Sequence, residues 1–174
     1  TTVYSKILKE IYPDVPVLIG GIEASLRRVT HYDYWADKLF PSILVDSQAD
    51  MLVYGMGEQP LREIIRGVKS GIPLKDLTNI NQVAFLQPKE QALPVVESWE
   101  TVELSSHEEC LVDKIKYAAN FKIVEVESNK WQANRITQQV ADQTLVINPP
   151  FKTMDEVEMD RSFDLPYTRL PHPK

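Results

Sequence analysis

Glycine and glutamate residues stand directly after two apolar runs, where a backbone can come close to a ligand. Residues 15–19 lead into Gly20 and Gly21, and residues 51–54 lead into Gly55. Glycine adopts positive φ and tolerates close approach, and in open α/β sheets ligands lie beyond the carboxyl ends of the strands. The spacing therefore predicts a ligand-binding edge. Its predicted cofactor-binding residues are Gly20, Gly21, Glu23, Gly55, Gly57 and Glu58.

These two turns do not have the spacing of a nucleotide site. The first lacks the G-x-G-x-x-G pattern, and in the second Pro60 stands where the third glycine would fall. A Walker phosphate loop is absent as well, so neither NAD nor ATP is predicted. A purely structural explanation stays open, in which the glycines only form tight strand–helix turns. In that explanation Glu58 complements the dipole of the following helix.

An aromatic segment at residues 31–35 combines an imidazole, a carboxylate and three aromatic rings. One interpretation is a loop that faces a substrate, with the imidazole available to carry a proton. The alternative is an aromatic cluster that holds the loop on the sheet or docks another domain. The residues of this predicted substrate or interface loop are His31, Tyr32, Tyr34 and Trp35.

The remaining reactive residues do not form a catalytic or metal site. The three histidines are scattered along the chain without metal-ligand spacing. Cys110 has no visible partner that would make it a nucleophile, so it is interpreted as a small apolar helix residue. No catalytic residue, metal ligand or bound cofactor is therefore expected in this chain.

The elements that must position these residues follow from apolar spacing and helix caps. The predicted strands are residues 15–19, 43–45, 51–54, 82–86 and 144–147. The predicted helices are residues 2–11, a helix that begins near Pro60, a long helix from 107 to near 126 opened by an S-x-x-E capping box, and residues 130–140. Residues 23–35 are predicted as a helical turn followed by an aromatic loop.

This order of elements predicts an α/β fold. It corresponds to a Rossmann-like, parallel-sheet half-domain followed by a mainly helical region. A change of composition near Pro88 places the boundary, so the predicted domains are residues 1–87 and 88–174.

Composition limits the class of protein. The chain has 174 residues, a net charge of −6 and one cysteine. A pI near 5.1 does not favour nucleic-acid binding. No apolar run is long enough to span a membrane, and a single cysteine fits a reducing compartment, so a cytoplasmic protein is predicted. Position 1 is Thr, and residues 165–174 are proline-rich. We therefore expect a piece of a longer protein.

Several strings resemble the YgiQ family of uncharacterised radical SAM proteins. They are VLIGGIEASLRR at 17–28, HYDYW at 31–35 and DMLVYGMGE at 50–58, supported by residues 148–150, 158–160 and 165–173. More broadly, the two glycine turns look like those of the cobalamin-binding-type Rossmann domain that precedes many radical SAM domains. The resemblance covers nearly the whole chain.

The resemblance implies an accessory N-terminal region that is inactive alone. It also implies a parent protein with a CxxxCxxC loop soon after Lys174, a [4Fe-4S] cluster and S-adenosylmethionine. The expected partner is then the protein's own radical SAM domain. Two alternatives stay open: a cobalamin-like small-molecule binding module, and a scaffold that docks the radical SAM domain without a ligand. Cobalamin itself is in doubt because the D-x-H-x-x-G motif does not occur in this chain.

Overall fold

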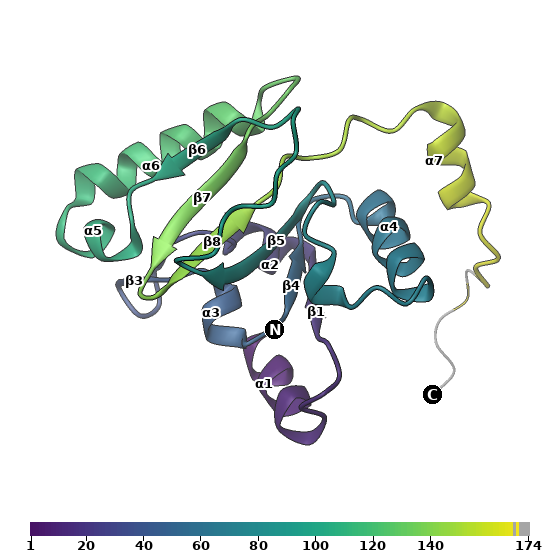
Figure 1. Cartoon of the computed structure of the whole chain (residues 1–174), viewed down its shortest axis with the longest axis horizontal. Coiled ribbons are helices and arrows are strands. Elements are labelled where there is room, and N and C mark those ends of the chain that lie inside the picture. Colours follow the sequence, from purple (N-terminus) through teal and green to yellow (C-terminus); the bar gives the residue numbers. More distant parts are fainter. Residues whose placement is uncertain (169, 171–174) are drawn as a thin grey trace.

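A six-stranded mixed sheet forms the centre of the molecule, with strand order β1–β4–β5–β8–β7–β6 (Figure 1). The computed structural model describes residues 1–168 and 170; part of the tail string at 165–173 lies outside them. The strands are β1 (Leu18–Ile19), β4 (Met51–Val53), β5 (Val83–Pro88), β6 (Thr101–Leu104), β7 (Arg135–Val140) and β8 (Gln143–Ile147).

Two strand–helix–strand units give the sheet its parallel pairs. β1 pairs in parallel with β4, and β6 pairs in parallel with β7. The pairs β4–β5, β5–β8 and β8–β7 are antiparallel. As a result, the carboxyl ends of β1, β4 and β8 lie on the same edge of the sheet as the amino ends of β5, β7 and β6. This edge carries both glycine turns.

Helices cover the two faces of the sheet because strand residues alternate between two apolar clusters. One face packs against α2 (Gly21–Leu26), α3 (Ile43–Ser47) and α6 (Lys114–Ser128). The opposite face packs against α4 (Glu58–Lys69) and the short 3-10 helix η1 (Leu74–Asp76). In β4, Leu52 joins the first cluster while Met51 and Val53 join the second, which is the expected two-residue period.

The remaining elements extend from this core. They are α1 (Thr2–Ile11), the hairpin of β2 (His31–Asp33) and β3 (Lys38–Phe40), α5 (His107–Val112) and α7 (Glu156–Phe163). Figure 1 shows α7 on an arm at the side of the sheet that carries α4. Within the described residues, no helix is long and apolar enough to cross a membrane.

The α/β class with a Rossmann-like half-domain is confirmed. The predicted helix at 2–11 and the strands near β1, β4, β5 and β8 are present. The capping box is also present: the Ser106 hydroxyl accepts from Glu109 N, and the Glu109 carboxylate accepts from Ser106 N. Parallel pairing, however, holds for β1–β4 and β6–β7, while β5 joins the sheet antiparallel.

Three of the local predictions before residue 130 are wrong. Residues 43–45 form α3 rather than a strand, because the Ser42 hydroxyl caps Leu44 N at 3.3 Å. The long helix beginning at 107 breaks at Asp113, whose extended backbone ends α5 and whose carboxylate caps α6. The hairpin β2–β3 replaces the predicted loop in the aromatic segment.

The helix predicted at residues 130–140 is also wrong, because β7 occupies 135–140. Ile136 and Val140 alternate with polar residues at the strand period, but a buried Gln138 lies on the same face and hides the apolar pattern. With β6, β7 and β8, the region after residue 88 contributes half of the six strands and is less helical than predicted. The division at residues 87 and 88 stays a prediction, although the sheet continues across it.

Candidate functional site

The two glycine turns lie side by side at one edge of the sheet. Ile19 pairs with Leu52, so Gly20 and Val53 both follow directly from paired positions. A Cβ placed on Gly20 would lie 3.2 Å from the carbonyl oxygen of Val53. The absence of a side chain at Gly20 therefore lets the ends of β1 and β4 approach each other. The predicted cofactor-binding glycines are brought together in the fold.

Backbone conformation requires glycine at two of the other three positions. Gly21 has φ +83° and Gly55 has φ +66°, which are left-handed conformations that favour glycine. Gly57 has φ −84°, and a Cβ there would make an ordinary 3.4 Å contact with Leu61. The backbone conformation at position 57 therefore does not require glycine, whereas the conformation of Gly55 does.

Ser25, which was not among the predicted site residues, bridges the two turns. Its hydroxyl donates to Gly21 O at 2.8 Å and accepts from Gly55 N at 3.0 Å. The N–H of Gly55 therefore has a partner within the chain and is not presented to a ligand. The only sequence signal is the position of Ser25, one helical turn after Gly21.

Gln82 holds the Gly55 turn from the other side. Its side-chain amide donates to the carbonyl oxygens of Tyr54 and Met56, and its Oε1 accepts from Phe151 N at 3.2 Å. The turn is therefore attached both to β5 and to the segment that follows β8. A residue just before a strand, far from Gly55 in the chain, carries no sequence signal for this contact.

The two predicted glutamates lie on different helices and have different surroundings. Glu23, on α2, accepts from the Thr1 hydroxyl and pairs with Arg27 at 3.4 Å. The hydrogen bond from Thr1, followed by the positive charges nearby, lowers the pKa of Glu23. Glu58 lies in the first turn of α4, where negative charge complements the helix dipole. Its Oε2 is buried without a partner among the described residues.

The aromatic segment forms the β2–β3 hairpin rather than part of the glycine edge. The His31 ring stacks on Phe40 with 6.2 Å between centroids, and burial lowers the pKa of His31. Tyr32 donates to Asp37 at 2.6 Å. Tyr34 and Trp35 pack on each other at the hairpin tip, 67% and 81% exposed. The segment is thus divided between a half-buried base and an exposed tip.

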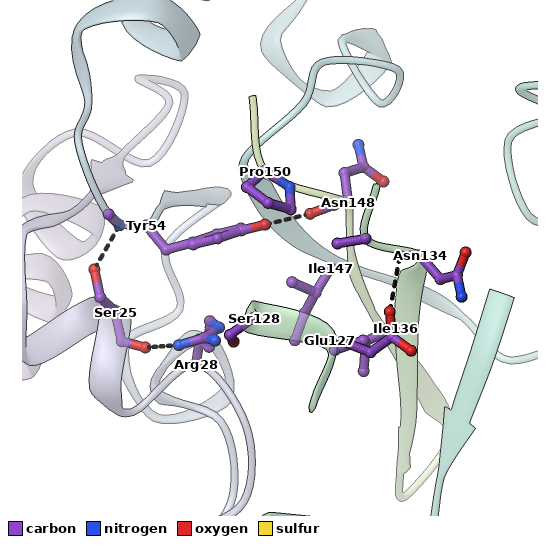
Figure 2. A pocket seen from close by; sticks show the side chains of 12 residues that line it. Ser25, Arg28, Tyr54, Glu127, Ser128, Asn134, Ile136, Ile147, Asn148 and Pro150 are labelled. Carbon is purple, nitrogen blue, oxygen red and sulfur yellow. Dashed lines mark hydrogen bonds between the residues drawn. The ribbon is translucent and has the colours of Figure 1, made fainter. Parts of the chain in front are cut away.

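A cavity of about 270 Å³ lies beside the Gly55 turn, between α2 and the end of α6 (Figure 2). Arg28 borders it, with its guanidinium 5.0 Å from the Tyr54 ring centroid and 2.6 Å from Ser25 O. The Tyr54 hydroxyl donates to Asn148 O at 2.6 Å. Burial lowers the pKa of Arg28 and raises that of Tyr54. Neither residue was predicted as a site residue, although the sequence has an adjacent basic pair at 27–28.

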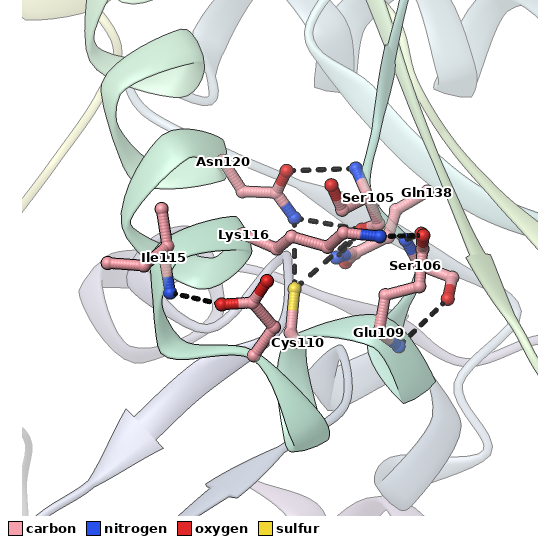
Figure 3. Close-up of polar contacts among 9 residues, drawn as sticks. Ser105, Ser106, Glu109, Cys110, Ile115, Lys116, Asn120 and Gln138 are labelled. Atoms are coloured by element: carbon pink, nitrogen blue, oxygen red, sulfur yellow. Dashed lines mark hydrogen bonds and ion pairs between the residues drawn. The ribbon is translucent and has the colours of Figure 1, made fainter.

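Cys110 lies on α5, away from this edge, and its side chain faces Asn120 of α6. It is 1% exposed, its sulfur accepts from the Asn120 amide at 3.1 Å, and Ser105 O lies 3.8 Å away (Figure 3). Burial raises the pKa of the Cys110 thiol, which disfavours the reactive thiolate. Among the described residues, no group of three or more His, Cys, Asp or Glu side chains is arranged to hold a metal ion.

Comparison with known proteins gives the class of protein that this fold and edge define. The whole chain, residues 1–174, matches the family described as radical SAM N-terminal, and the chain therefore belongs to that family. The predicted resemblance to the YgiQ family is confirmed, because the similar proteins carry its other name, UPF0313.

Three relatives show how far the similarity reaches. A UPF0313 protein of Porphyromonas gingivalis is 56% identical over 100% of this chain and 27% of its own length. One of Bacteroides thetaiotaomicron is 52% identical over 99% of this chain and 29% of its own length. One of Methanocella arvoryzae is 38% identical over 99% and 28%. The chain thus spans less than a third of these relatives. No solved structure matches.

Replacement by alanine is expected to have different effects on stability at the two glycines of the second turn. Gly55→Ala is expected to lower the free energy of unfolding by about 1–2 kcal/mol, because its φ is left-handed. The new Cβ would also lie 3.2 Å from Gln82 Nε2. Gly57→Ala, the matched control, is expected to change it by less than about 0.5 kcal/mol. Urea unfolding followed by circular dichroism measures both changes in the free energy of unfolding. Equal losses would contradict the conclusion that Gly55 must be glycine and Gly57 need not be.

Proposed function

We propose that this chain is the accessory N-terminal region of a radical SAM protein and docks against the protein's own catalytic domain. In this proposal the catalytic domain, outside residues 1–174, holds the [4Fe-4S] cluster and S-adenosylmethionine, and this chain is inactive alone. Membership in the family supports the proposal, and so does the small share of the relatives' length that the chain spans. The division into residues 1–87 and 88–174, and a cytoplasmic location suggested by the single cysteine, belong to the same proposal.

The residues of this chain do not fit a [4Fe-4S] cluster. Such clusters are held by several cysteine thiolates, whereas the sequence has one cysteine. That residue, Cys110, is buried and hydrogen-bonded to Asn120. The cluster ligands are therefore assigned to the remainder of the protein, and no chemical step is assigned to this chain.

One observation carries the docking role: α7 has no buried residue. An isolated helix of eight residues is marginal in water and gains stability mainly from packing its apolar side. Val157 and Met159 of this helix are 59% and 36% exposed. A hydrogen bond from Gln59 to Glu158 at 3.2 Å joins α7 to the body. A surface of the catalytic domain would supply the missing packing.

The hairpin tip offers a second contact for the same docking. Tyr34 and Trp35 expose two rings to solvent, tilted against each other with 4.6 Å between centroids, and such amphipathic rings are enriched at interfaces. This agrees with the interface interpretation of the aromatic segment. Replacement of both rings by alanine would loosen the packing between domains without a change in ligand affinity.

Hydrogen exchange on the full-length protein and on residues 1–174 alone tests the docking. We expect the α7 amides to be protected only in the full-length protein, since α7 has no buried residue here. The amides of β8, which is central in the sheet, are the internal control and are expected to be protected in both. Equally fast exchange of α7 in both proteins would refute the docking role.

Anaerobic reconstitution of the full-length protein tests the assignment of the cluster. Iron–sulfur absorption is expected in the full-length protein and in its Cys110→Ala variant, because Cys110 is buried and belongs to no metal-holding group among the described residues. It is expected to be absent from residues 1–174 alone. Loss of the absorption in Cys110→Ala, with the fold intact by circular dichroism, would overturn the assignment.

A second candidate function, binding of a small cobalamin-like molecule, is favoured by the paired glycine turns. The turns from β1 and β4 are adjacent, and Ser25 joins them. In this proposal Gly20, Gly21, Glu23, Gly55, Gly57 and Glu58 border the ligand. Titration of cobalamins against the full-length protein tests it: a spectral shift that is lost in Gly55→Ala supports it, and no shift refutes it.

A further inference from the structure

A groove separates two parts of the chain. One wall is α2 with the residues that follow it, and the other wall is one side of α6. The groove consists of the 270 Å³ cavity of Figure 2 and an adjoining hollow of about 420 Å³, and Arg28 and Ser128 line both. We call the two together the α2–α6 groove. The residues Tyr32, Tyr117 and Phe121 line the larger of its two parts. A cation therefore lies in the middle of a groove with aromatic walls.

Arg28 differs from its neighbour Arg27 in having no acidic partner. Arg27 pairs with Glu23 at 3.4 Å and with Asp33 at 3.2 Å. Arg28 donates one hydrogen bond, to Ser25 O, and lies over the Tyr54 ring. A guanidinium has five N–H donors. Within the part of the chain that the structure describes, the other donors of Arg28 have no acceptor, although the residue is half-buried.

The two carboxylates that line the groove are engaged elsewhere. Glu127 accepts from Lys130 and, at 3.0 Å, from Asn134 N. Glu125 accepts from Asn129 at 3.2 Å. Neither forms an ion pair with Arg28 in the described structure. The stacking of Arg28 on Tyr54 and its bond to Ser25 fix the guanidinium plane before a ligand arrives, which reduces the entropy lost on binding.

We propose that the α2–α6 groove binds a small aromatic acid, whose carboxylate or phosphate pairs with the guanidinium of Arg28. A planar fork of N–H donors matches both anions in bidentate geometry. The aromatic body of the ligand lies against Tyr32, Tyr117 and Phe121, which expose ring surface to the groove. This site is separate from the proposed docking through α7 and does not depend on it.

Calorimetric titration of the full-length protein with benzoate, phenyl phosphate and benzamide tests the site. Both anions are expected to bind, and benzamide, which has the same shape as benzoate but no charge, is expected not to bind. Tighter binding of phenyl phosphate would identify a phosphoryl ligand, and tighter binding of benzoate a carboxylate; either supports the proposal. Equal binding of benzamide and benzoate, or no binding of either anion, would overturn it without the need for a variant.

The adjacent arginines provide a matched pair of variants. Arg28→Gln is expected to weaken anion binding roughly 10- to 100-fold, the range for a lost hydrogen bond to a charged group. Arg27→Gln removes the same charge one residue away and is expected to leave the affinity unchanged, since Arg27 is paired with two acids. Circular dichroism checks that both variants are folded. Equal weakening by the two variants would show a general charge effect and refute a site at Arg28.

Discussion

Leu52→Ala is expected to lower the free energy of unfolding by about 3–5 kcal/mol, the range for a large-to-small change in a core. Leu52 is 0% exposed and lies in β4, between β1 and β5. Its side chain belongs to the apolar cluster that joins the sheet to α2, α3 and α6. The surrounding strands and helices leave little room for collapse around the cavity. Urea unfolding of the chain, followed by far-UV circular dichroism, measures the loss.

Leu26→Ala is the matched control for this prediction. Leu26 is the same residue type on α2 but is 70% exposed. Its replacement is expected to change the free energy of unfolding by less than about 0.5 kcal/mol. If Leu52→Ala were as mild as the control, the described core at β4 would be wrong.

Gln138→Leu is expected to lower the free energy of unfolding by about 1–3 kcal/mol, although it places an apolar residue in the interior. Gln138 is 0% exposed. Its Oε1 accepts from the N–H and the hydroxyl of Thr30 at 3.0 and 3.1 Å, and its Nε2 donates to Ser105 O at 3.0 Å. The variant leaves the buried N–H of Thr30 unpaired, whereas the Thr30 hydroxyl keeps His107 Nδ1 at 3.0 Å and Ser105 O keeps the Asn120 amide at 2.8 Å. The unpaired N–H is more unfavourable than the gain from an apolar side chain.

The adjacent Gln139 offers the comparison. It is half-buried, and its side chain accepts a hydrogen bond from the Thr144 hydroxyl at 3.1 Å. Gln139→Leu is therefore expected to reduce the free energy of unfolding by less than about 1 kcal/mol. Thermal unfolding of the two variants beside the unchanged chain measures the difference. A more stable Gln138→Leu protein would contradict the network that joins Thr30, Gln138 and Ser105.

Local patterns in the sequence were sufficient for the elements whose cause is local. The capping box at Ser106 and the apolar run that leads into Gly20 predict a helix start and a strand end, and both are present. The break at Asp113 is local too, but its cap on Ile115 N lies inside an otherwise continuous helical pattern. An internal cap of this kind is hard to distinguish from a solvated surface residue.

Contacts between distant segments determine the buried and site residues that the sequence pattern did not predict. Gln138 looks like a surface residue in the sequence, yet its partners Thr30 and Ser105 come from distant segments and bury it. The same holds for Arg28, whose surroundings combine α2, the end of β4 and α6. A groove formed by three separate segments leaves no spacing signal along the chain. The placement of the two glycine turns at one edge of the sheet could be predicted from the sequence. The position of the Arg28 guanidinium next to them could not.

The position of β8 has a consequence for synthesis on the ribosome. β8 lies between β5 and β7, so the last strand made fills the middle of the sheet. Until residues 143–147 leave the exit tunnel, β5 and β7 each have one unpaired long side. Unpaired strand sides readily join other chains. One side of β5 therefore stays open while residues 89–147 are made, whereas β7 is followed almost at once by β8. A chaperone that shields β5 would favour correct assembly.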